Sequence, residues 1–268
     1  MSRPVSISSL SAPPAPIFPD GFRLDGRTAL VTGSARGLGW EIARAMAQAG
    51  ARIWLHGRSA DRLAPRLAAL RQAGHQADGL VFDMADRAAM AGEVARAGQI
   101  DILVHNVGER DRRPFADIEP EAFARLVDID LVAAHALVKL VVPGMQERRW
   151  GRLILVSSIV ASLASPGSSS YISAKAGLAA LSRALACELG STGITSNALA
   201  PGFFATETNA KLSGSAAGER LRERCPAKRW AEPHEIAGAA LFLASPAASF
   251  VNGHTLTVDG GVSATYLA

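Results

Sequence analysis

The sequence predicts an α/β fold of the Rossmann type, a single doubly wound seven-stranded parallel sheet with helices on both faces. Three observations support this prediction. The chain has 268 residues, enough for one large α/β domain. From Arg27 onward, short aliphatic or β-branched runs alternate with alanine-rich segments of helical period. A glycine-rich turn follows the first of these runs, where such folds bind ligands.

Seven apolar runs are expected to form the strands of the sheet. Helical stretches separate nearly all of them, and right-handed crossovers of this kind make neighbouring strands parallel. The expected strands are residues 28–32, 51–56, 77–82, 100–105, 152–157, 195–200 and 255–258. Because no internal repeat is evident, we expect residues 21–268 to form one domain.

The first 20 residues are rich in Ser and Pro and are expected to form a flexible leader. The leader has too few contiguous apolar residues for a secretion signal, and nowhere do about 20 apolar residues occur together. No membrane association is therefore expected. Cys187 and Cys225 lie far apart in no metal-like or disulfide-like spacing, so we expect no metal site and a reducing, cytoplasmic location.

The charge of the chain is modest, with 28 basic and 24 acidic residues and a formal net charge of +4. No run of five or six basic residues marks a nucleic-acid tail. No nucleic-acid partner is therefore expected, and the charge alone names no other partner; a small-molecule substrate is expected from the catalytic and cofactor motifs instead.

The glycine-rich turn directly follows the first expected strand and opens a helix expected from about Trp40 to Ala49. Its spacing from Thr32 is T-G-x-x-x-G-x-G. Glycines let the chain turn sharply and bring backbone N–H groups against a pyrophosphate, at a helix N-terminus that favours anions. A plain tight turn is the simpler alternative. The dinucleotide contacts expected here are Gly33, Ser34, Arg36, Gly37, Leu38 and Gly39.

The second expected strand ends in His56-Gly57-Arg58, where NAD-dependent enzymes generally carry an acidic residue for the adenosine ribose. No carboxylate is present there. Arg58 and Arg36 could instead bind a 2′-phosphate through charge-assisted hydrogen bonds. The sequence therefore favours NADP over NAD as cofactor, the alternative being that both arginines are simply solvated.

Polar residues also follow the third and fourth expected strands. Asp83 and the adjacent Met84 follow the third strand, and Asn106 follows the fourth. Nucleotide ligands lie along the carboxyl edge of such sheets, so these residues are expected to contact the cofactor. Asp83 and Asn106 could equally be ordinary turn formers.

Ser158, Tyr171 and Lys175 form the most discriminating constellation in the chain. Residues four apart share a helix face, so the Lys175 ammonium would lie beside the Tyr171 ring and favour its phenolate. Tyr171 could then exchange a proton with a substrate oxygen while hydride moves at the neighbouring carbon. Ser158 would hold the same oxygen in line. An exposed helix pair is the alternative for Tyr171 and Lys175.

In this order the motifs resemble the short-chain dehydrogenase/reductase family, from Arg27 to Gly261. The resemblance is carried by the glycine turn, Asn106-Val107-Gly108, Ser158, the Y-x-x-x-K of Tyr171 and Lys175, and Pro201-Gly202 followed by Thr206. It implies an oxidoreductase acting on CH–OH groups with a nicotinamide cofactor. It further implies cofactor contacts by Asp83 to adenine, Asn106 and Gly108 near the ribose, Lys175 to the nicotinamide ribose, Pro201 and Gly202, and Thr206 to the carboxamide.

One departure from the family pattern concerns its fourth catalytic residue. The helix asparagine of the family corresponds to Asp130 here, within Val127-Asp128-Ile129-Asp130. A carboxylate at that place puts the family's proton-relay water network in question. If the relay uses mainly the backbone carbonyl, activity would survive with an altered pH optimum.

The segments around Arg58, Phe203 and Trp230 look most like the gluconate 5-dehydrogenase-like branch, which implies NADP-dependent reduction of a keto-sugar acid such as 5-ketogluconate. Arg112 is similar to a basic position of that branch and would join Ser158 and Tyr171 in binding substrate, the alternative being a solvated basic loop. We expect a substrate lid near residues 203–228, helical over 211–224.

Two other functions stay open at this point. Within enzymes, the alternative is a 3-oxoacyl thioester reductase. In a different class, the chain could be a non-catalytic dinucleotide-sensing protein, because fold does not fix function. Similar proteins are mostly homotetramers, so a homotetramer or homodimer is expected, formed in part by the small apolar residues of the helix that carries Tyr171.

Overall fold

The computed structural model describes residues 19–265, so most of the expected leader, residues 1–18, lies outside the described residues. The described chain folds around one seven-stranded parallel sheet of order β3-β2-β1-β4-β5-β6-β7. Its strands are β1 (Thr28–Val31), β2 (Arg52–Gly57), β3 (Ala77–Val81), β4 (Ile102–His105), β5 (Gly151–Val156), β6 (Ile194–Pro201) and β7 (Thr255–Val258). All seven expected strands are confirmed, with ends shifted by two residues at most.

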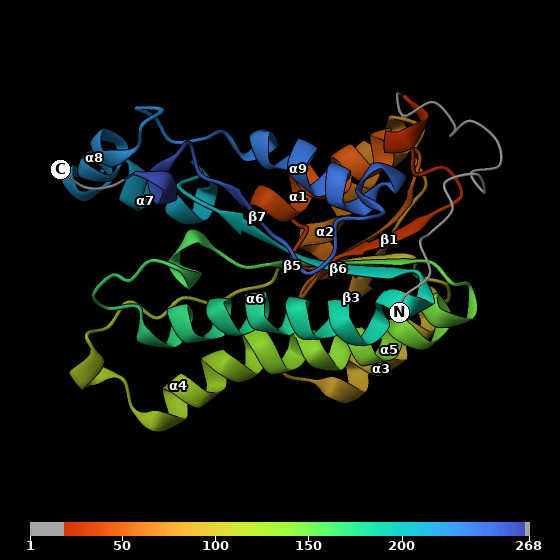
Figure 1. Cartoon of the computed structure of the whole chain (residues 1–268), viewed down its shortest axis with the longest axis horizontal. Coiled ribbons are helices and arrows are strands. Elements are labelled where there is room, and N and C mark those ends of the chain that lie inside the picture. Colours follow the sequence, from red (N-terminus) through yellow and green to blue (C-terminus); the bar gives the residue numbers. More distant parts are fainter. Residues whose placement is uncertain (1–18, 266–268) are drawn as a thin grey trace, which may run out of the picture.

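Helices cover both faces of the sheet, as the sequence predicts (Figure 1). One layer consists of α1 (Gly37–Gln48), α2 (Ala60–Gln72) and α9 (Ala237–Ala244). The other consists of α3 (Arg87–Ala97), α4 (Pro120–Val127), α5 (Ala133–Glu147) and α6 (Ser169–Leu189). No helix within residues 19–265 combines the length and the apolar character needed to cross a membrane.

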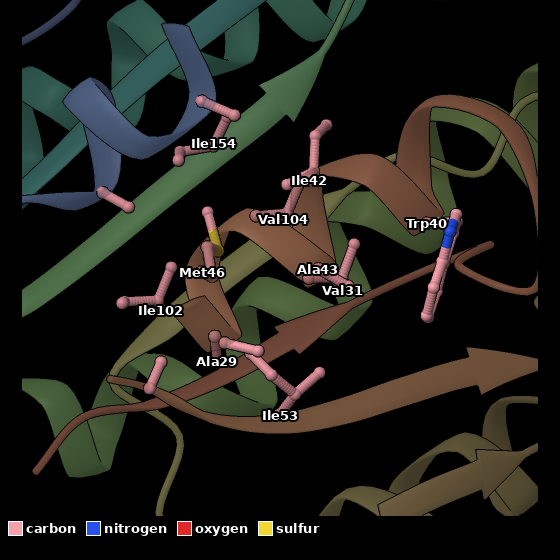
Figure 2. Close-up of a cluster of buried hydrophobic side chains, with 14 of the residues drawn as sticks. Ala29, Val31, Trp40, Ile42, Ala43, Met46, Ile53, Ile102, Val104 and Ile154 are labelled. Carbon is pink, nitrogen blue, oxygen red and sulfur yellow. The ribbon is translucent and has the colours of Figure 1, made fainter. Parts of the chain in front are cut away.

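The central strands are apolar on both faces because each face of the sheet carries a separate core. In β1, Ala29 and Val31 pack with Ile42 and Met46 of α1 (Figure 2), whereas Leu30 belongs to the cluster on the opposite face. All five side chains are fully buried. Successive strand residues point to opposite faces, so a run without polar residues is what a two-sided core requires.

The order of strands places the candidate site. Strand β1 pairs with β2 on one side and with β4 on the other, so the direction of winding reverses between β1 and β4. In open parallel sheets the crevice at such a switch point, beyond the carboxyl ends of the strands, is where ligands bind. The glycine turn after β1 and Asn106 after β4 both lie at this crevice.

Two irregular helical segments surround the crevice. A π-helical turn, Asp128–Val132, joins α4 to α5 and carries the fully buried Asp130. On the other side, the single helix expected over 211–224 is divided into α7 (Ala210–Ser213) and α8 (Ala216–Arg224). Ser215 separates them because its hydroxyl accepts the Gly218 N–H and begins a new helix. The two helices lie together at one end of the molecule (Figure 1).

Candidate active site

A cavity of about 480 Å³ opens at the carboxyl ends of the central strands and gathers most of the site residues expected from the sequence. The expected residues that line it are Gly33, Arg36, Gly37, Leu38, Arg58, Asp83, Met84, Asn106, Gly108, Ser158, Tyr171, Lys175, Pro201, Gly202 and Thr206. They come from segments up to 173 positions apart in the chain, between Gly33 and Thr206. The glycine turn and the Ser-Tyr-Lys constellation therefore face one continuous space.

Two expected contacts in the glycine turn lie behind the cavity wall instead. The fully buried Ser34 uses its hydroxyl to accept the His56 N–H at 2.9 Å. Gly39 lies at the close approach of α1 to the sheet, where a Cβ would come within 2.6 Å of Asn106 Nδ2 and of Gly33 O. Both residues hold the turn in shape rather than facing the cavity.

His56, at the end of β2, fastens the glycine turn to the sheet. The Gly33 N–H donates to His56 Nδ1 at 3.1 Å, so Nε2 carries the hydrogen and donates to Phe82 O at 3.1 Å. The first bond needs a neutral ring, because a protonated Nδ1 could not accept the Gly33 N–H. Burial lowers the pKa of His56 to about 4, which keeps the ring neutral at physiological pH.

The three chemical residues come from two elements. Ser158 follows β5 and caps a short 3₁₀ turn, its Oγ 3.4 Å from the Val160 N–H. Tyr171 and Lys175 lie on α6, with Lys175 Nζ 5.7 Å from the centre of the Tyr171 ring. Lys175 is 3% exposed and donates to Val156 O at 3.1 Å. A buried cation is thus fixed beneath a tyrosine that reaches the cavity.

Asp130 lies under this group rather than in the cavity wall. Its Oδ1 accepts the Glu109 N–H at 2.7 Å, and its Oδ2 lies 3.4 Å from Lys175 Nζ, an ion-pair distance without a hydrogen bond. Burial raises the pKa of Asp130 although the Lys175 charge opposes the shift. Gly108 makes this approach possible, because a Cβ there would come within 2.7 Å of Lys175 Nζ.

The backbone carbonyl of Asp130 also has a partner. His105 Nε2 lies 3.1 Å from it and must carry the hydrogen, since a carbonyl oxygen can only accept. Burial, together with the Lys175 charge, lowers the pKa of His105 to about 3, so this ring is neutral. Its Nδ1 is buried with no hydrogen-bond partner among the described residues. One of the carbonyl's two lone pairs is therefore already in use.

A second cavity of about 660 Å³ adjoins the first and shares Tyr171 and Ser158 with it. Its charged lining consists of Arg110, Asp111, Arg112 and Arg224. Arg113 donates hydrogen bonds to the Asp111 carboxylate, which balances its negative charge and lowers its pKa to about 2. Arg112 and Arg224 form no ion pair with residues 19–265. The cavity beyond the tyrosine is thus a basic one.

A third hollow, at the far end of the first cavity, is also basic. It is lined by Gly33, Ala35, Arg36, His56, Gly57, Arg58, Ser59 and Arg62, a set without a carboxylate. The nearest acidic group to Arg58 is Asp83, at 3.7 Å. A glycine turn at the start of α1 with arginines beside it fits the diphosphate and a further phosphate of a dinucleotide.

Several residues at the site were not identified from the sequence. Arg62 lies in the first turn of α2, close to Arg58 in the chain, and could have been found as a further arginine of the same segment. His56 and His105 could not, because their roles depend on neighbours brought in by adjacent strands. Asn209 lines both main cavities, and nothing in its sequence neighbourhood marks it.

Comparisons with known proteins agree with this geometry. Residues 33–263 match the family profile described as enoyl-(acyl carrier protein) reductase. The chain is 38% identical to 2-dehydro-3-deoxy-D-gluconate 5-dehydrogenase of Formosa agariphila, covering 92% of this chain and 96% of that protein. It is 36% identical to gluconate 5-dehydrogenase of Gluconobacter oxydans, over 91% and 98%.

A solved structure extends the likeness to the fold. Gluconate 5-dehydrogenase from Burkholderia cenocepacia, crystallised in complex with NADP and tartrate, is 39% identical and superposes with a TM-score of 0.88. The alignment covers 92% of this chain and 99% of that one.

Proposed function

This chain belongs to the short-chain dehydrogenase/reductase family, whose members are NAD(P)-dependent oxidoreductases acting on CH–OH groups, and we propose that it uses NADP to interconvert a carbonyl and a secondary alcohol on a small, polar, anionic substrate. A keto-sugar acid such as 5-ketogluconate fits this description. The observation that supports it most is that Ser158, Tyr171 and Lys175 face the same cavity as the glycine turn and its arginines.

The chain's own residues supply the proton and the alignment. The nicotinamide, when bound, supplies or accepts the hydride. Tyr171 passes its hydroxyl proton to the substrate oxygen, and the buried Lys175 ammonium stabilises the negative charge that develops on the phenol. Ser158 donates a hydrogen bond to the same oxygen and keeps it in line. Asp130 holds the Glu109 backbone and lies beside Lys175, acting through these neighbours.

NADP is favoured by the basic hollow that contains Arg36, Arg58 and Arg62. A 2′-phosphate there would meet guanidinium groups and no carboxylate in the lining, since the nearest carboxylate, Asp83, lies outside the hollow at ion-pair distance from Arg58. The Burkholderia cenocepacia relative was crystallised with NADP, which supports the same choice.

An anionic substrate is favoured by the cavity beyond Tyr171. Arg110, Arg112 and Arg224 line it, and its one carboxylate is held by Arg113. Relatives named as acting on gluconate or a related sugar acid support a carboxylate-bearing substrate. We assign α7 and α8 to the expected lid, since both Leu212 and Leu221 line this cavity from those helices.

The second candidate is reduction of a 3-oxoacyl thioester. The apolar side of the same cavity, formed by Leu163, Leu212, Leu221 and Val262, could receive an acyl chain, and the matching family profile carries an acyl-carrier-protein reductase name. The arginines disfavour it, because an acyl chain offers them no anion.

A substrate panel tests the proposal. Purified protein with NADPH is expected to reduce 5-ketogluconate or another keto acid faster than an acetoacetyl thioester. Tyr171→Phe should lower kcat by about 10²-fold or more, the usual size of a general acid's contribution, while NADPH still binds. NADPH fluorescence of the variant is the control, because it shows that the altered protein still folds and binds the cofactor. Equal turnover by Tyr171→Phe would refute the role of Tyr171 as general acid, and binding of NADPH without turnover of any carbonyl would favour the sensing protein instead.

We also propose that the chain works in the cytoplasm as a homotetramer or homodimer. Phe123, Val132 and Leu140 are 36%, 46% and 40% exposed along α4, the π-helical turn and α5, where a second copy could cover them. Ala174 and Leu178 of α6 face the chain's own core, which leaves the exposed Ala180 and Ala184 for such a contact. Light scattering after size exclusion should show a multiple of 27.9 kDa, and a monomer would refute the assembly.

A further inference from the structure

Arg110 contacts the hydroxyl of Tyr171 from the substrate side. Its Nη2 is 3.5 Å from Tyr171 Oη, and its guanidinium carbon is 5.0 Å from the centre of the Tyr171 ring. It lines both the first cavity and the basic one beyond it. Arg112 lines only the second.

The position of Arg110 is set by its neighbours in the chain. The preceding residue, Glu109, donates its N–H to Asp130 Oδ1 at 2.7 Å and pairs its carboxylate with Arg125 at 2.8 Å. The carboxylate of the following residue, Asp111, accepts hydrogen bonds from Arg113 Nε. With both flanking residues fixed, the backbone of Arg110 is held and its side chain is directed over Tyr171.

The partner of Arg110 on the far side is neutral. Nη1 donates to Asn209 Oδ1 at 2.9 Å, and Asn209 Nδ2 donates to Phe204 O at 2.9 Å. The second bond orients the amide so that its oxygen faces the arginine. Within residues 19–265 no carboxylate lies at ion-pair distance from Arg110, so its charge is held in place without being neutralised.

From this geometry, and resting on the proposed function, we propose that Arg110 is the specificity-determining residue that binds the carboxylate of the substrate. A guanidinium offers a planar pair of donors that matches a carboxylate, and a bound carboxylate would replace the neutral contacts with charge-assisted ones. Arg110 also contacts the Tyr171 hydroxyl. A carboxylate bound to Arg110 would therefore place the reacting oxygen of the same substrate beside Tyr171. Arg112 and Arg224, farther along the wall, would complete a basic surround.

A binding assay on the complex with NADP⁺ tests this assignment. The ligands are tartrate, a small hydroxylated dicarboxylate, and its neutral diamide, which has nearly the same shape. Arg110→Gln is expected to weaken tartrate binding about tenfold or more, the loss typical of a hydrogen bond to a charged group, and to leave the diamide unaffected. Arg110→Lys should restore part of the loss, since it keeps the charge but not the fork.

Two comparisons make the result decisive. Arg112→Gln should cost less tartrate affinity than Arg110→Gln, and a larger loss there would overturn the assignment. Equal weakening of tartrate and diamide in Arg110→Gln would show a merely structural role, and unchanged tartrate binding, or no preference of the unaltered protein for tartrate over the diamide, would refute the inference. The assay needs no turnover, so failure of the proposed reaction and failure of this assignment give different results.

Discussion

At the scale of single residues, Asp130 is a buried acid whose two oxygens do different work. Oδ1 anchors the loop that presents Arg110, and Oδ2 faces the Lys175 ammonium. An asparagine would keep the first contact and lose the second. One substitution, Asp130→Asn, therefore measures whether the cost of burying the Asp130 carboxylate exceeds its attraction to the Lys175 ammonium.

Asp130→Asn should change how stability depends on pH. Burial raises the folded-state pKa of Asp130 above its unfolded value of 3.8, so the native state holds this proton more tightly than the unfolded chain does. The carboxyl's contribution to stability is thus greatest below 3.8 and declines as pH rises to the raised pKa. We expect Asp130→Asn to gain in free energy of unfolding relative to the parent as pH rises through this window, measured by urea unfolding. Asp128→Asn on the same turn is the control, and a constant difference would contradict the prediction.

His56 shows the opposite linkage. The pKa of His56 is about 4 in the folded protein and 6.5 in the unfolded chain. Between these two pH values the unfolded chain binds a proton at His56 and the native protein does not. Stability should therefore fall between pH 6.5 and 4, by about 3 kcal/mol from this residue. His56→Gln should remove most of that slope. The exposed His135→Gln should not, and unfolding curves at several pH values with equal slopes for His56→Gln and the parent would refute the coupling.

These residue roles also mark the limit of what the sequence can predict. Tyr171 and Lys175 could be predicted to meet because four positions on a helix share a face. Arg110 could not be separated from Arg112 in the same way, since its direction depends on a bond between Glu109 and Asp130, 21 positions away. Contacts between loop residues that are far apart in the chain produce no periodic pattern in the sequence, so they cannot be predicted from it.

At the scale of elements, the strands were predictable for a physical reason and the irregular helices were not. Strands buried on both faces need largely apolar runs, and the central strands β1, β4 and β5 show this most clearly. The π-helical turn at Asp128–Val132 and the division at Ser215 depend on single hydrogen bonds and on packing rather than on composition. The segment expected to be helical over 211–224 is accordingly helical but divided into two helices, and its role as a lid stays a prediction.

Two glycines inside helices make a matched test of element packing. Gly39 in α1 leaves no room for a Cβ, which would come within 2.6 Å of Asn106 Nδ2 and Gly33 O, whereas Gly92 in α3 faces open space. Gly92→Ala should stabilise the fold by up to about 1 kcal/mol through helix propensity. Gly39→Ala should instead destabilise it by about 1–3 kcal/mol through overpacking, and weaken NADPH binding. Thermal unfolding and NADPH fluorescence would measure both, and equal effects of the two substitutions would contradict the packing argument.

At the scale of the whole molecule, the first cavity is lined by segments that follow six of the seven strands. Gly33, Arg58 and Asp83 come from the β1–β3 side, and Ser158 and Pro201 from the β5–β6 side. A dinucleotide that bridged them would bind only the assembled sheet. Its binding energy would then add to the stability of the entire fold, by about 2.7 kcal/mol when its concentration is a hundred times the dissociation constant.

The cofactor preference should therefore be readable in thermal unfolding. For a domain of this size about 2.7 kcal/mol corresponds to a rise of roughly 5–10 °C in the midpoint, and we expect NADP⁺ to produce a larger rise than NAD⁺ at equal concentration. Replacing both Arg36 and Arg58 with Gln should bring the two responses together by lowering the one to NADP⁺. Added salt should act in the same direction, because the arginines lie at an open edge where ions screen them. If NAD⁺ stabilised the parent protein as much as NADP⁺ did, the basic hollow would be a solvated surface rather than a binding site for the 2′-phosphate. The preference for NADP would then be wrong, whereas the proposed chemistry of Ser158, Tyr171 and Lys175 would be unaffected.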